Sequence, residues 1–128
     1  MVSSVAQVVE APPEPGVVLT RAVLQASDHL GITAKVLANV LGLSEPSISR
    51  MRRGDFALEP ATKPFEIGVL YVRLFRSLDA IVGGDSNVAK QWLGNSNTML
   101  AARPVEKIQT IAGLIDVIEY LDARRARI

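Results

Sequence analysis

Regularly spaced glycines are the feature that most restricts how this chain can fold. Gly31, Gly42 and Gly54 interrupt apolar patterns that repeat with the period of a helix, and each stands where a helix would end. Glycine readily adopts the left-handed backbone conformation that terminates many helices. We therefore expect two short helices between Gly31 and Gly54, joined by a tight turn at Gly42.

Capping residues indicate the same two helices. Thr33 precedes a helix predicted over residues 34–41, and Ser44 precedes the second one. A hydroxyl at this position accepts a hydrogen bond from a free backbone amide of the first turn. Glu45 and Pro46 suit that turn. A carboxylate there complements the helix dipole. Proline lacks an amide hydrogen, which costs little because amides of the first turn have no helical partner.

Helical patterns also cover most of the remaining chain, and none of it alternates in the manner of a strand. Apolar residues recur at spacings of three and four, the period of an amphipathic helix. The predicted elements are a first helix from near Thr20 that buries Leu19, Val23, Ala26 and Leu30, a long central helix from Pro64 to Gly83, a short helix over residues 87–93 capped by Asp85 or Ser86, and a last helix from Pro104 that bends at Gly113 and turns Leu114, Ile115, Val117, Ile118 and Leu121 inward. The predicted fold class is all-α.

Composition excludes several classes of protein. The 128 residues contain no cysteine, which rules out a disulfide framework and a cysteine-ligated zinc site. Charged residues interrupt the most apolar stretch, residues 67–82, so we expect no membrane span. The amino terminus lacks the features of a signal peptide, and a cytoplasmic location is expected. We divide the chain into a flexible arm at residues 1–16, a first helical domain at 17–62 that contains the two short helices, and a second helical domain at 63–128.

The two short helices carry the residues that a helix-turn-helix requires. Ala38 is small enough for the helices to approach each other, Gly42 makes the turn, and Ile48 supplies an apolar anchor from the second helix. Met51 lies one turn beyond Ile48 on the same inward face. The polar residues of the second helix are then left for the outside.

An exposed helix with hydroxyls and arginines fits the major groove of DNA. We expect Ser44, Ser47 and Arg50 to contact bases and Arg52, Arg53 and Lys35 to contact phosphates, with Ser49 also on the outer face. The alternative is a structural helical turn with a solvated arginine cluster. Helix-turn-helix proteins gain affinity by placing two DNA-binding domains on two half-sites of operator DNA. We therefore also expect a homodimer.

Two parts of the chain resemble known families. Residues 34–54 (AKVLANVLGLSEPSISRMRRG) look like the Xre, or phage repressor-like, helix-turn-helix. The pattern that resembles the toxin-binding domain of the Xre/MbcA/ParS antitoxins comprises residues 89–97 (AKQWLGNSN), Leu100, residues 103–106 (RPVE), Thr110, Gly113, Val117 and Leu121. The resemblance implies an antitoxin that pairs with a RES-domain toxin, an enzyme of the ADP-ribosyltransferase type that uses NAD, and that represses its own operon.

Candidate toxin contacts follow in the second half. They are Trp92, Asn95, Asn97, Arg103, Arg124, Arg125 and Arg127. Trp92, the only tryptophan, is either an interface anchor or part of the core, and the asparagines either cap helices or contact a protein. The terminal arginines are either solvated or, as the resemblance suggests, reach into the nucleotide cleft of the toxin and block access of NAD.

No residue pattern supports catalysis. His29 is the sole histidine and is expected to cap or cover the end of the first helix, while Asp116 and Glu119 have no nucleophile or further metal ligand nearby. Gly83 and Gly84 lack the residues of a phosphate loop. We expect no enzyme activity, metal or cofactor. Two alternatives to an antitoxin stay open, a stand-alone repressor and an adaptor that has lost DNA contact.

Overall fold

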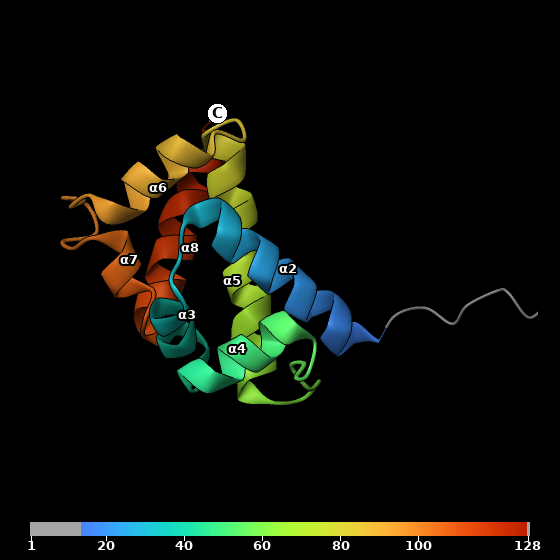
Figure 1. Ribbon diagram of the computed structural model, residues 1–128. Helices are drawn as coiled ribbons and strands as arrows, with labels where there is room; N and C mark the ends of the chain where they lie inside the picture. The colour runs from blue at the N-terminus through green and yellow to red at the C-terminus, as the bar shows by residue number, and fades with distance from the viewer. Residues whose placement is uncertain (1–13, 128) are drawn as a thin grey trace, which may run out of the picture.

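The computed structural model describes residues 14–127, which fold into a helical protein (Figure 1). Its helices are α2 (Pro15–Leu30), α3 (Ala34–Leu41), α4 (Glu45–Arg53), α5 (Lys63–Ile81), α6 (Ser86–Gly94), α7 (Pro104–Lys107) and α8 (Ile111–Ala126). Residues 14–127 contain no strand, and an isolated bridge joins Asn97 to Ala102. The all-α prediction is confirmed. Most of the predicted arm lies outside the described residues.

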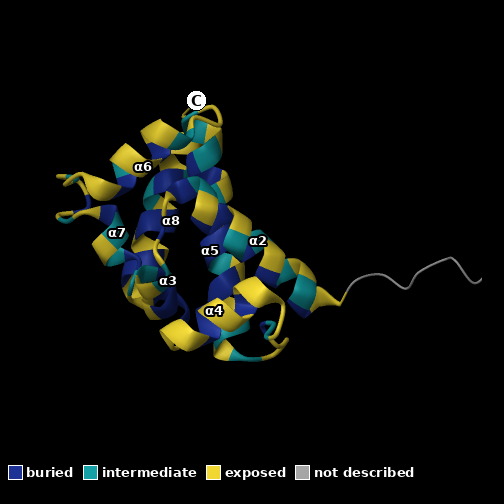
Figure 2. Ribbon diagram, in the orientation of Figure 1, coloured by how far each residue is buried: buried dark blue, intermediate teal, exposed yellow. Residues whose placement is uncertain are grey.

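Helix α5 lies at the centre of the molecule. Helices α8 and α2 pack along it, and α3 and α6 also contact it. Its buried residues include Tyr71 and Leu74, which belong to one apolar core shared with α2, α3, α4 and α8 (Figure 2). The core is therefore continuous across the predicted domain boundary at residues 62 and 63.

The start of α2 differs from the predicted one. The helix begins at Pro15, whose missing amide hydrogen costs little in a first turn. Thr20, expected near the start, is buried; its hydroxyl donates to the Gly16 carbonyl (2.6 Å) and accepts from the Leu58 amide (2.9 Å). Thr20 thus joins α2 to the loop after α4.

The short helices α3 and α4 have the predicted caps. The Thr33 hydroxyl accepts from the Val36 amide (3.2 Å), and the Ser44 hydroxyl accepts from the Ser47 amide (3.3 Å). Gly42 follows α3 with φ of 72°, in the left-handed region that glycine adopts without strain. The local signals therefore predicted both helices correctly.

One helix was predicted from Pro104 onward, with a bend at Gly113. The structure has two separate helices there, α7 and α8. Thr110 caps α8 by accepting from the Gly113 amide (3.1 Å), so the break falls between α7 and α8. Gly113 lies inside α8, where an added Cβ would lie 1.9 Å from the Lys107 carbonyl oxygen. The inward placement of Ile115 was wrong, since it is 40% exposed. Its neighbours Leu114, Val117, Ile118 and Leu121 are buried as predicted.

Asp85, rather than Ser86, caps α6 and accepts from the Asn87 and Val88 amides (3.0 and 3.2 Å). The Ser86 hydroxyl instead donates to the His29 carbonyl at the end of α2.

Within residues 14–127, no helix is both long enough and apolar enough to cross a membrane.

Candidate functional site

The outer face of α4 presents most of the residues predicted to read DNA. Ile48 and Met51 turn into the core, while Ser44, Ser49 and Arg50 are exposed. A helix that is anchored on one face and exposes hydroxyls and a guanidinium on the other has the form that a major groove accepts.

Ser47 was wrongly placed on the outside, because only 7% of this residue is exposed. Its hydroxyl lies 2.9 Å from the Ser44 hydroxyl and accepts from Arg50 Nη2 at 3.1 Å. The Arg50 guanidinium also lies over the ring of Phe56, 5.7 Å from its centroid. Ser47 and Phe56 therefore orient Arg50. The sequence pattern gave no signal for Phe56, because this contact arises from the path of the loop after α4.

Carboxylates hold the other two arginines of α4. Arg52 Nη2 lies 2.9 Å from Asp28 Oδ1 on α2, and Arg53 Nε donates to Asp55 Oδ2 at 3.3 Å. Lys35 is exposed on the first turn of α3. The predicted phosphate contacts are thus on the surface, but two of the three already have internal partners.

In the second half, Trp92 on α6 stacks with Tyr120 on α8. Their ring centroids are 6.1 Å apart and the planes differ by 19°. Both residues line a cavity of about 200 Å³ whose wall includes Leu78, Val88 and Arg124. Trp92 is half-buried, so it packs against the core and still has an accessible part.

The loop between α6 and α7 is tied to this aromatic pair. Asn97 Oδ1 accepts from the amides of Met99 and Leu100 (2.9 and 3.1 Å) and so shapes the loop. Hydrogen bonds from Asn97 and Arg124 hold the pKa of Tyr120 below its usual value. Arg124 Nη1 lies 3.0 Å from the Tyr120 oxygen. Trp92, Asn97 and Arg124 thus gather around Tyr120, which sequence reasoning missed.

The remaining candidates have other surroundings. Asn95 is exposed directly after α6, and Arg103 pairs with Glu106 (3.1 Å). Arg125 Nη1 donates to the Ser77 hydroxyl of α5 (3.3 Å), and Arg127 is exposed at the end of α8. The arginines at the end of α8 are therefore exposed, although Arg124 and Arg125 each donate a hydrogen bond within the protein.

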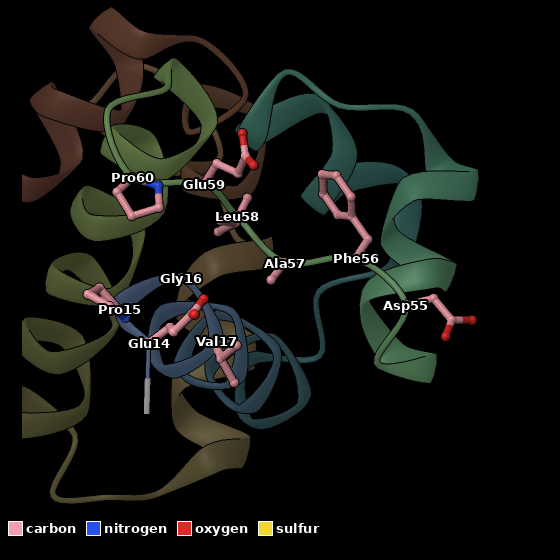
Figure 3. A pocket seen from close by; sticks show the side chains of 10 residues that line it. All are labelled: Glu14, Pro15, Gly16, Val17, Asp55, Phe56, Ala57, Leu58, Glu59 and Pro60. Carbon is pink, nitrogen blue, oxygen red and sulfur yellow. The ribbon is translucent and has the colours of Figure 1, made fainter. Parts of the chain in front are cut away.

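A hollow lies between the start of α2 and the loop over residues 55–60 (Figure 3). Its floor includes Leu58, which is buried and joined through its amide to Thr20.

Residues 14–127 hold no cluster of three or more side chains suited to a metal ion. His29 packs edge-on against Phe75 (5.4 Å), and its Nε2 lies 3.5 Å from Asp79 Oδ1.

Comparison with protein families decides the assignment. Residues 12–73 match the antitoxin Xre-like helix-turn-helix domain, and residues 77–127 match the antitoxin Xre/MbcA/ParS carboxy-terminal toxin-binding domain. The chain belongs to the Xre-type antitoxins. A comparison with curated proteins finds no match.

The two matches give each half of the antitoxin a role. The first domain contains α2, α3, α4 and half of α5, with the exposed face of α4. The second contains the Trp92–Tyr120 pair and the end of α8. The antitoxin therefore combines a DNA-binding domain with a toxin-binding one, and the expectation of a non-enzymatic protein agrees with both families.

Proposed function

We propose that this antitoxin neutralises a RES-domain toxin, an enzyme of the ADP-ribosyltransferase type that uses NAD, and represses its own operon in the cytoplasm. The observation that carries the proposal is the presence, in one chain, of an outward-facing α4 and a toxin-binding domain. One molecule would then sense the toxin and occupy the operator.

DNA reading is assigned to the exposed face of α4. Ser44, Ser49 and Arg50 would contact base edges, and Lys35, Arg52 and Arg53 would contact phosphates. Two copies would place two such faces on an operator with two half-sites. Val18 and Val69, each about half exposed beside a groove between α2 and α5, offer apolar surface for the second copy.

Toxin binding is assigned to the surface around Tyr120 and to the last turn of α8. Large aromatic side chains and arginines contribute much of the binding free energy of protein interfaces. Trp92 and Arg124 supply both types around Tyr120. Asn95, Asn97 and Arg103 would extend this surface, while Arg125 and Arg127 would enter the nucleotide cleft of the toxin and exclude NAD.

The test is growth rescue in cells that express the toxin encoded beside this antitoxin. Deletion of residues 123–128 should abolish rescue, because the last turn would no longer fill the cleft. Circular dichroism should show a helical content close to that of the full chain, since the removed residues that the structure describes are exposed.

The matched control changes the other domain. Arg50→Ala should leave rescue intact, because Arg50 lies on α4 and contacts Ser47 and Phe56 there. Full rescue by the truncated chain would refute occlusion by the carboxy terminus. Loss of rescue with Arg50→Ala would show that neutralisation depends on the DNA-binding domain instead.

A further inference from the structure

The three arginines of α4 differ in the charge of their partners. Arg50 is held by uncharged groups, the Ser47 hydroxyl and the Phe56 ring. Arg52 and Arg53 are each paired with a carboxylate, Asp28 and Asp55 respectively. Among these three arginines, Arg50 is therefore the one whose partners do not include a carboxylate.

The two ion pairs contribute little to the stability of the fold. The side chains of Arg52 and Asp28 are 41% and 65% exposed, and those of Arg53 and Asp55 are 61% and 63% exposed. Ion pairs this exposed are weakened by solvent and by the entropy of fixing two long side chains. Their main effect is then on the electrostatic potential of the surface beside α4.

We infer that Asp28 and Asp55 compete with DNA phosphates for Arg52 and Arg53 and thereby keep binding to non-operator DNA weak. This inference rests on the proposed role of α4 in DNA reading. A paired arginine reaches a phosphate either by leaving its carboxylate or by bringing that carboxylate close to the polyanion. Either process makes the binding free energy from phosphate contacts less favourable. Phosphate contacts supply nearly all of the affinity for random sequences.

The experiment measures how salt affects binding of the full chain to a short random-sequence duplex, by fluorescence anisotropy between about 50 and 200 mM salt. Asp28→Asn should free Arg52 for one additional phosphate. The slope of log K against log salt should become steeper by about 0.9, with roughly tenfold tighter binding at the lowest salt. Asp55→Asn should have the same effect through Arg53.

Two controls isolate the cause. Glu106→Gln changes the net charge equally but removes the partner of Arg103 on α7, and it should leave the slope unchanged. In the double variant Asp28→Asn with Arg52→Gln, the gain should disappear, because the freed arginine is absent. A gain that persists in the double variant would overturn competition for Arg52.

The outcomes also separate this inference from the proposed function. If the unmodified chain binds DNA with a salt dependence that Asp28→Asn and Asp55→Asn both leave unchanged, the competition is wrong while DNA reading stands. If the unmodified chain binds neither its operon's upstream DNA nor the random duplex, DNA reading by α4 fails, and the inference fails with it.

Discussion

The hydroxyl of Ser27 on α2 lies 2.8 Å from the phenol oxygen of Tyr71 on α5, and both residues are fully buried. This hydrogen bond joins the first helix of the DNA-binding domain to the central helix within the core. Each polar group satisfies the other, so removing one partner leaves a buried group without that bond.

Tyr71→Phe should lower the free energy of unfolding by about 1–3 kcal/mol, because the Ser27 hydroxyl loses its partner in the core. Ser27→Ala should cost a similar amount. The double variant should be less destabilised than the sum of the two, since no polar group then stays unpaired. Urea unfolding of the four proteins measures this, and additive losses would show that the hydrogen bond contributes nothing.

Stability should fall at alkaline pH because of the same tyrosine. Burial raises the pKa of Tyr71 far above its ordinary value, an effect that the hydrogen bond with Ser27 only partly offsets. Above about pH 10 the unfolded chain loses this proton while the folded chain retains it, so the free energy of unfolding decreases by up to about 1.4 kcal/mol per pH unit from this group.

Tyr71→Phe should therefore show a smaller decrease than the unmodified chain when urea unfolding is compared on the two sides of pH 10. Tyr120 has a lowered pKa and acts in the opposite direction, but it is present in both proteins and cancels in the comparison. Equal decreases in the two proteins would mean that Tyr71 is not protected from titration.

Gly16→Ala should destabilise the fold by about 2 kcal/mol or more. A Cβ at this position would lie 2.1 Å from the Leu58 carbonyl oxygen, so α2 and the loop after α4 must separate. Gly94→Ala is the control, since its Cβ would meet nothing within 4 Å. Thermal unfolding should show a clearly lower melting temperature for Gly16→Ala and little change for Gly94→Ala. Equal shifts of the melting temperature in the two variants would contradict the close packing at Gly16.

Arg50→Ala should weaken binding to a duplex selected in vitro by the unmodified chain more than binding to a random duplex. Ser47→Ala should act in the same direction, by roughly fivefold, because it removes one hydrogen bond that orients Arg50. Arg103→Ala, a loss of positive charge on the other domain, should change neither affinity. Equal losses on both duplexes would make Arg50 a phosphate contact.

Local signals in the sequence predicted the helix pair of the DNA-binding domain well. Thr33, Gly42, Ser44 and Gly54 act on backbone within a few residues, so their positions define where α3 and α4 begin and end. The helix start expected near Thr20 was wrong, because Thr20 lies inside α2 and contacts Leu58, which is far along the chain.

The errors in the candidate site have the same origin. Ser47 has the residue type of a DNA contact, yet its position on α4 turns it partly inward. The pairing of Arg52 with Asp28 joins two helices that are distant in sequence, and no local pattern reports it. Ile115 was misplaced because it was assigned inward by its apolar residue type, although it lies at the edge of the helix face that buries Leu114, Val117, Ile118 and Leu121.

We propose that this antitoxin binds a RES-domain toxin through its second domain. The most direct test is to purify the tagged chain together with the product of the adjacent gene and to determine the mass of what elutes. The expected result is a stable complex that contains both proteins, with a RES-domain toxin as the partner. A chain that elutes without the neighbouring protein, although that protein is expressed and folded, would contradict it.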